Sequence, residues 1–213
     1  FKTRLIYSFL TVSLLFGFYE YSRKQSYRFI QELSERHEQL AMHDPLTHLP
    51  NRRGMKVHLE HEYNRLIRSQ QPFSVLVCDI DHFKRVNDQY LHDGGDFVLE
   101  QLSAFFLKKI RKQDIVARWG GEEFLFLLPG TTSKDAYILA EKIRTEVEAQ
   151  TIHYKSNAIR ITLSIGVNEV TADTNVDHAI NLADSSLYIA KEQGRNQTVS
   201  AHTINNEVTL QAL

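Results

Sequence analysis

The stretch that most constrains the fold of this chain is RWGGEEFLFLLPG, residues 118–130, in which a glycine pair separates two apolar runs. Gly120 and Gly121 supply the positive-φ backbone that a tight hairpin turn needs, so the flanking runs are predicted to be neighbouring antiparallel strands. Two carboxylates, Glu122 and Glu123, come directly after the glycines. Acidic side chains between a turn and a buried strand indicate a site at the end of a sheet.

Apolar spacing elsewhere predicts alternating helices and strands. The expected helices are 52–70, 82–90, 96–112, 133–150 and 176–193, and the expected strands are 73–80, 114–119, 124–129 and 159–170. Ser133 is the candidate N-cap of the fourth helix and Gly194 closes the last. This order predicts an α+β fold (a mixed α/β sandwich), with one central, mostly antiparallel sheet flanked by helices.

The N-terminal part differs in character. Residues 5–19 carry no charge and lie between basic residues, with more of them on the C-terminal side. A bilayer span needs about 20 apolar residues, so residues 1–20 are interpreted as a transmembrane anchor or its remnant. An interfacial amphipathic helix and a residual signal sequence are the alternatives. The distribution of basic residues predicts that the chain beyond residue 20 lies in the cytoplasm.

Residues 21–43 are polar and predict a signalling helix, so that a long N-terminal helix precedes the sheet domain. Ile30, Leu33, His37 and Leu40 could form the narrow seam of a short coiled coil. The prolines of DPLTHLPN end this helix. The boundaries are therefore a folded domain at 44–200 and a C-terminal tail at 201–213.

Composition limits the partners of the chain. The 25 basic and 26 acidic residues give a formal net charge of −1, so no overall field attracts nucleic acid, and none is expected as a partner. The single cysteine, Cys78, lies in an apolar run and reads as a small buried hydrophobe. Any phosphate chemistry must therefore depend on local charge.

A candidate metal site is predicted from the strand ends. The strand 73–80 ends in Asp79 and Ile80, and Asp81 is the next residue. If this strand neighbours the hairpin, Asp79 and Glu122 converge at one edge of the sheet. Paired carboxylates there suit Mg²⁺, which commonly combines one or two carboxylates with substrate phosphates. The alternative is that these acids are solvated turn residues.

Other polar residues could bind a nucleotide. Lys84 lies one helical turn beyond the acids, within reach of a phosphate, and Asp96 could accept both guanine N–H donors while repelling adenine N1. Lys191 and Arg195 are spaced i,i+4 and would share a helix face. They could clamp phosphates or cap the end of a helix.

Residues 44–200 resemble the GGDEF-family diguanylate cyclases, in a GGEEF variant, which make cyclic di-GMP from two GTP. The matching stretches are DPLTHLPNRR at 44–53, DIDHFKRVND at 79–88, LHDGGD at 91–96, RWGGEEF at 118–124, TLSIGV at 162–167 and ADSSLYIAKEQGRN at 183–196. Two positions depart from the usual pattern. Leu91 replaces a glycine, and Glu122 replaces the commoner aspartate.

The resemblance implies a fold like that of nucleotidyl cyclases and polymerase palms. It also implies the roles of individual residues. Mg²⁺, with Mn²⁺ as an alternative ion, would be held by the Asp79 side chain, the Ile80 carbonyl and Glu122, with Glu123 as a second contact. Glu122 would accept the proton of the 3′-hydroxyl, and Lys84 would stabilise charge on the phosphate. The substrate-binding residues would be Asn87, His92, Asp96, Lys191 and Arg195.

The resemblance further implies a homodimer, since each domain would hold one GTP. Arg111 and Asp114, in RKQD, would form an inhibitory site for the product, cyclic di-GMP. The expected location is the bacterial inner membrane, with the catalytic domain in the cytoplasm. The alternative function is a non-catalytic receptor module that binds cyclic di-GMP through Arg111 and Asp114.

Overall fold

The computed structural model describes residues 14–28 and 42–201. It divides into two compact units between Ala41 and Met42. The first contains a helix over residues 14–28, whose side chains are nearly all exposed. No helix in the described part of the chain combines the length and the apolar character needed to cross a bilayer. Residues 1–13 of the expected anchor, the expected coiled-coil seam and residues 202–213 of the tail lie outside the described residues.

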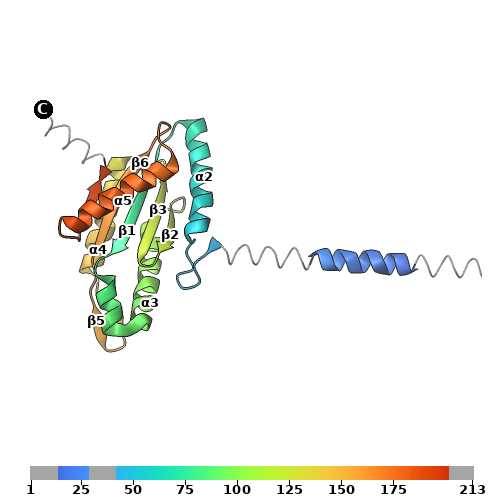
Figure 1. Ribbon diagram of the computed structural model, residues 1–213, viewed down its shortest axis with the longest axis horizontal. Coiled ribbons are helices and arrows are strands. Elements are labelled where there is room, and N and C mark those ends of the chain that lie inside the picture. Colours follow the sequence, from blue (N-terminus) through green and yellow to red (C-terminus); the bar gives the residue numbers. More distant parts are fainter. Residues whose placement is uncertain (1–13, 29–41, 202–213) are drawn as a thin grey trace, which may run out of the picture. The chain divides into compact units, whose positions relative to one another are not determined.

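The second unit is built on a five-stranded sheet in the order β2-β3-β1-β6-β7 (Figure 1). The strands are β1 (Phe73–Ile80), β2 (Ile115–Gly120), β3 (Glu123–Pro129), β6 (Leu163–Val170) and β7 (Thr198–Ser200). Every pairing is antiparallel except that of β6 with β7. The predicted fold class, with a mostly antiparallel central sheet, is confirmed.

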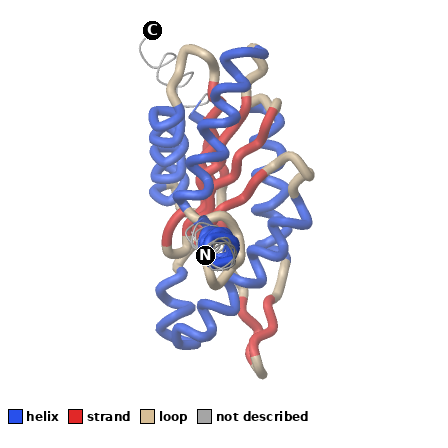
Figure 2. The backbone as a smooth tube through the Cα atoms, turned by 90° about the vertical axis from the view of Figure 1, so that its right-hand side faces the viewer, coloured by secondary structure: helices blue, strands red, loops and turns tan. Residues whose placement is uncertain are grey.

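Helices cover both faces of this sheet (Figures 1 and 2). The helices are α2 (Arg52–Ser69), α3 (Phe83–Lys109), α4 (Ser133–Ala149) and α5 (Val176–Glu192). Alternate residues of β1 divide between two apolar cores. Leu76 and Cys78 pack with α3 and α4, whereas Val75 and Val77 pack with α2 and α5. All eight residues of β1 are buried, which explains its continuous apolar run.

Two helix starts differ from the prediction. The helix expected at residue 96 is continuous with the preceding one, because α3 runs from Phe83 through a kink at Leu91 and makes Gly94 and Gly95 helical. The N-cap of α4 is Thr132, whose side chain accepts a hydrogen bond from the Asp135 N–H, and not Ser133. The Ser133 hydroxyl is instead buried, 3.0 Å from the hydroxyl of Ser200.

The predicted strand at 159–170 is divided in the structure. Its first residue ends β5 (Asn157–Ile159), which pairs with β4 (Ile152–Tyr154) in a separate two-stranded hairpin. Residues 160–162 then lead into β6. Figure 2 shows this hairpin extending from one end of the domain. Neither β4, β5 nor the short β7 was expected as a separate strand.

Candidate functional site

Asp79 lies near the end of the central strand β1, where it faces α5. Its Cα pairs with Glu123 on β3 and with Ser164 on β6. It shares the parity of Val75 and Val77, and its side chain therefore points toward the α2–α5 core. The residue is 7% exposed. Lys191, in the last turn of α5, places its Nζ atom 2.8 Å from Asp79 Oδ2.

The electrostatics around Asp79 are unbalanced. Burial raises the pKa of its carboxyl, the hydrogen bond and charge of Lys191 lower it, and the charges of Glu122 and Glu123 raise it again, to about 6. Asp79 therefore has one ammonium partner and two negatively charged neighbours. An additional cation at this end of the sheet would stabilise all three carboxylates in their charged form.

The hairpin turn is one residue later than the glycine pair suggested. Gly120 ends β2 and pairs with Glu123, so the turn itself consists of Gly121 and Glu122. Glu123, the first residue of β3, is consequently the direct cross-strand neighbour of Asp79. Glu122 is half-buried on the turn next to this pair. The structure thus brings together the three predicted metal-binding carboxylates, with Glu123 and not Glu122 opposite Asp79.

This arrangement fits a magnesium site completed by a substrate. Within residues 14–28 and 42–201, no three His, Cys, Asp or Glu side chains are arranged closely enough to hold a metal ion by themselves. Mg²⁺ usually binds one or two carboxylates together with substrate phosphates and water. A buried aspartate with two adjacent glutamates, at a sheet end reached by a lysine, meets that requirement.

Asp81 has a different role from Asp79, although it lies only two residues further on. Its Oδ2 accepts hydrogen bonds from the Thr162 hydroxyl at 2.7 Å and the Asn196 N–H at 3.0 Å, and its Oδ1 accepts one from the Ser164 hydroxyl at 2.7 Å. These contacts attach the loop between β1 and α3 to β6 and to the turn after α5. Asp81 is therefore a structural residue.

The predicted helical pairing of Lys191 and Arg195 is wrong. The helix α5 ends at Glu192, and Arg195 has a φ of 65° in the turn beyond it. Gly194, at φ 113°, closes the helix as predicted. Lys191 reaches Asp79 because α5 lies very close to β6, where a Cβ atom on Gly166 would be 1.9 Å from a backbone oxygen of α5.

The three predicted nucleotide-binding residues of α3 lie on either side of its kink. Leu91, with φ 61° and ψ 178°, turns the helix between Asn87 and the pair formed by His92 and Asp96. A Cβ atom on Gly95 would be 2.0 Å from Asn87 Oδ1, so the second half of the helix packs directly against that side chain. Asn87 is half-buried, and His92 and Asp96 are exposed. Lys84, one turn before the kink, is also exposed.

The comparisons with known proteins agree with this geometry. The family described as "Diguanylate cyclase, GGDEF domain" matches residues 41–197. The chain belongs to the GGDEF family. The diguanylate cyclase DgcP of Pseudomonas aeruginosa is 39% identical over 163 residues, which are 76% of this chain and 24% of DgcP. The chain thus spans about a quarter of the length of this relative.

Two solved structures share the fold. One is the coiled coil and GGDEF domain of DgcB from Caulobacter crescentus in complex with c-di-GMP. It has a TM-score of 0.78 and 26% identity, over 84% of this chain and 95% of that one. The other is the active GGEEF domain of a diguanylate cyclase from Vibrio cholerae. It has a TM-score of 0.66 and 34% identity, over 71% of this chain and 96% of that one.

An arginine that sequence reasoning did not single out links the hairpin to the start of the GGDEF domain. Arg118 Nη1 lies 3.1 Å from both carboxylate oxygens of Asp44, and Arg118 Nε donates to the Gly121 carbonyl at 2.9 Å. The Arg118 N–H also donates to the Pro50 carbonyl at 2.9 Å. The turn that carries Glu122 is therefore fixed to the segment that enters the domain. Both residues lie in the matching stretches, but their contact is visible only in the fold.

The predicted inhibitory site lies at the other end of β2. Asp114 is buried, its Oδ2 accepts a hydrogen bond from the Arg111 N–H at 2.8 Å, and burial raises its pKa. Its Oδ1 is also buried, and no hydrogen-bond donor reaches it from the described residues. The Arg111 side chain is exposed. The six residues of β2 separate this pair from the hairpin turn by roughly 20 Å at 3.3 Å per residue.

Proposed function

We propose that this GGDEF domain is a diguanylate cyclase, which condenses two GTP into cyclic di-GMP and releases two pyrophosphates. The observation that carries the proposal is the buried Asp79 carboxylate, which has Lys191 at 2.8 Å and whose pKa is raised by burial and by the charges of Glu122 and Glu123. A metal-bound triphosphate would supply the missing positive charge to the carboxylates and a negative partner to the lysine. The names of the relatives support the same activity.

The Asp79 side chain, the Ile80 carbonyl, Glu122 and Glu123 would hold Mg²⁺, or Mn²⁺ in its place. The ion would neutralise charge on the reacting phosphates. Glu122, on the hairpin turn, accepts the proton of the attacking 3′-hydroxyl. Lys84 stabilises negative charge that develops on the transferring phosphate.

The substrate-binding residues lie along the bend of α3 and at the end of α5. Asn87 and Asp96 recognise guanine across the kink, and His92 contacts the nucleotide. Lys191 and Arg195 bind phosphates from the other side. Since each domain holds one GTP and two must react, catalysis requires two domains face to face, and the chain acts as a homodimer.

Product inhibition is the second part of the proposal. The Asp114 Oδ1 atom is a buried acceptor without a donor among the described residues. Guanine offers two N–H donors to a carboxylate, and the exposed Arg111 guanidinium can bind the neighbouring phosphate. We therefore assign cyclic di-GMP to Arg111 and Asp114 as an inhibitory ligand.

Membrane attachment completes the proposal. The uncharged run at 5–19, with more basic residues after it than before it, supports an anchor in the bacterial inner membrane and a cytoplasmic catalytic domain. Fractionation of cells that express the full chain tests this assignment. Recovery of the chain entirely in the soluble fraction would contradict it.

The activity is tested by incubating the purified protein with GTP and Mg²⁺ and measuring cyclic di-GMP and pyrophosphate. Asp79→Asn and Glu122→Gln are expected to reduce turnover by at least about a thousandfold, while the circular dichroism spectrum stays that of the folded protein. The matched controls are Asp184→Asn and Glu60→Gln, which change exposed acids on α5 and α2. A dimeric enzyme also gives a specific activity that rises with protein concentration.

Absence of dinucleotide at every protein concentration, together with binding of cyclic di-GMP, would replace this proposal by the receptor alternative. A mixture of GTP and ATP tests the base specificity. Asp96 predicts that only the guanine product forms.

A further inference from the structure

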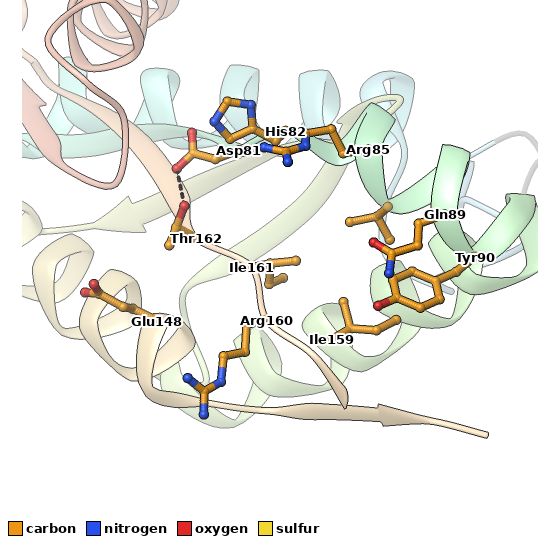
Figure 3. Close-up of a pocket in the computed structure, with 11 residues that line it drawn as sticks. Asp81, His82, Arg85, Gln89, Tyr90, Glu148, Ile159, Arg160, Ile161 and Thr162 are labelled. Atoms are coloured by element: carbon orange, nitrogen blue, oxygen red, sulfur yellow. Dashed lines mark hydrogen bonds between the residues drawn. The ribbon is translucent and has the colours of Figure 1, made fainter. Parts of the chain in front are cut away.

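A cavity of about 460 Å³ lies behind the first half of α3, at a place to which the proposed reaction assigns no role. Figure 3 shows His82 and Arg85 on the α3 side and Arg160 and Ile161 on the segment opposite. That segment connects β5 to β6. The volume falls within the roughly 300–1,000 Å³ of sites that take small organic ligands.

This cavity lies on the opposite side of the first half of α3 from Asn87, which is assigned to the nucleotide. Arg85 and Gln89, which line it, are four residues apart and share one helix face. Asn87 is two residues from each, which at 100° per residue turns its side chain to the opposite face. The cavity floor also belongs to the α3–α4 core through Ile159 and Ile161, whereas Asp79 faces α5.

The carboxylates and the guanidinium groups that line the cavity differ in their hydrogen-bond and ion-pair partners. Both carboxylates already have donors: Asp81 has three, and Glu148 pairs with Arg144 at 2.9 Å and accepts from the Asn196 amide at 2.8 Å. The two guanidinium groups are different. Among residues 14–28 and 42–201, no carboxylate pairs with Arg85 or Arg160, and no acceptor takes a hydrogen bond from either side chain. Both arginine side chains are exposed to solvent, so they can exchange water for an anionic group that enters the cavity.

The rest of the lining is suited to the body of an organic molecule. Val86, Ile159 and Ile161 are buried aliphatic residues that form an apolar floor. Gln89 and Tyr90 stand beside Ile159 at one end, where they offer an amide and a hydroxyl (Figure 3). Two arginines beside apolar residues are suited to bind a molecule that carries an anionic group on an aromatic or aliphatic body.

We propose that this cavity is a binding site for a small organic anion, a phosphomonoester or a carboxylate, held by Arg85 and Arg160. The ligand acts on the catalytic end of the domain through the loop it touches. Asp81 and His82 line the cavity and come directly after Asp79 and Ile80. A ligand that moves Thr162 also acts on Asp81, because the Thr162 hydroxyl donates to that carboxylate at 2.7 Å.

The test is an NMR titration of the ¹⁵N-labelled protein with 1-naphthyl phosphate and, in parallel, with 1-naphthoate. The expected result is saturable shifts of the amides of residues 159–162 and 89–90, with smaller shifts at 79–82. Inorganic phosphate carries only the negative charge, and 1-naphthol carries only the aromatic body. Each should therefore bind much more weakly than the two anionic naphthyl probes. The two anionic probes distinguish a phosphomonoester site from a carboxylate site.

Arg160→Glu should weaken the binding of the stronger probe by at least about tenfold, since it removes a charge-assisted hydrogen bond. Arg85→Glu provides a second, independent variant. Arg68→Glu changes an exposed arginine at the end of α2 and should leave the dissociation constant within about twofold.

Absence of amide shifts at 159–162 would overturn the site. Shifts that persist in both arginine variants would also overturn it, as would the same shifts with inorganic phosphate alone. Shifts confined to 159–162 and 89–90 would overturn the coupling to the catalytic loop. These measurements do not use turnover, so they stand or fall separately from the cyclase proposal.

Discussion

Arg118 offers the sharpest test of how the domain entrance is coupled to the catalytic hairpin. Replacing it by methionine removes its bonds to the Asp44 carboxylate at 3.1 Å and to the Gly121 carbonyl at 2.9 Å. The side chains of Arg118 and Asp44 are 19% and 16% exposed. Hydrogen bonds of charged groups contribute about 1.5–3 kcal/mol, whereas fully exposed ion pairs contribute about 0–1 kcal/mol.

We expect Arg118→Met to lower the free energy of unfolding by about 2 kcal/mol. The Asp44 carboxylate keeps part of its hydrogen bonding, because its Oδ1 still accepts from the Thr47 N–H at 2.8 Å and the Thr47 hydroxyl at 2.7 Å, and only Oδ2 loses its donor. The variant therefore avoids the larger penalty of a stranded charge. At about 2–4 °C per kcal/mol for a domain of this size, the melting temperature should fall by roughly 4–8 °C.

The assay is urea unfolding of the wild type, Arg118→Met, Asp44→Asn and the double variant, followed by circular dichroism. The coupling energy of this cycle should be about 1 kcal/mol. Arg53→Met, an exposed arginine on α2, is the matched control. A coupling energy below about 0.3 kcal/mol, or a loss of stability equal to that of the control, would refute the reasoning.

The same ion pair has a defined pH dependence. Burial raises the pKa of Asp44, but hydrogen bonds from Thr47 and Arg118 and the charge of Arg118 lower it below its ordinary value of 3.8. The pair therefore contributes fully above that value, and its contribution is lost as the pH falls through the folded-state pKa. Because Arg118 also fixes Gly121, next to Glu122, Arg118→Met should in addition reduce GTP turnover by about tenfold or more.

Three further changes test other parts of the domain. Leu91→Gly should raise the free energy of unfolding by about 1 kcal/mol in urea, since a backbone at φ 61° and ψ 178° is costly for any residue but glycine; a decrease would contradict this. Gly95→Ala should raise the KM for GTP by about tenfold, because its Cβ would be 2.0 Å from Asn87 Oδ1 and would displace that side chain; an unchanged KM would argue against a role for Asn87. Arg111→Ala should preserve turnover and weaken inhibition by cyclic di-GMP about tenfold. The control Lys112→Ala should leave this inhibition unchanged. Equal inhibition of the two variants would show that Arg111 is not part of the product site.

The fold class could be predicted from the sequence because each main element carries a local signal. The apolar run at 73–80 reads as a buried strand, and the amphipathic spacing at 52–70 gives α2 to within one residue. The hairpin at 152–159 was missed because its strands have only three residues each, too few for an alternation to be recognised. The positive φ of Lys155 at its turn has no glycine to mark it.

The sequence predicted that the carboxylates of Asp79, Glu122 and Glu123 lie together, but it did not predict which of them are paired across the strands. A shift of one residue in a strand turns every side chain to the other face. The glycine pair suggested a turn at 120–121, but the turn is at 121–122, and this places Glu123 opposite Asp79. The role of Asp81 was equally hidden, because its partners Thr162, Ser164 and Asn196 are at least 81 residues away in the sequence.

The different environments of Asp79 and Asp81 explain why one of them is suited to chemistry. Asp81 has hydrogen-bond donors on both oxygens, and these bonds use its side chain to hold the loop. Asp79 has one ammonium partner, and burial together with the charges of two nearby glutamates raises its pKa to about 6. The register of β1 with β3 holds the backbones of Asp79 and Glu123 directly opposite each other. A metal-bound phosphate would offset the negative charge around Asp79, and it is the ligand that the activity proposed for this GGDEF domain would use.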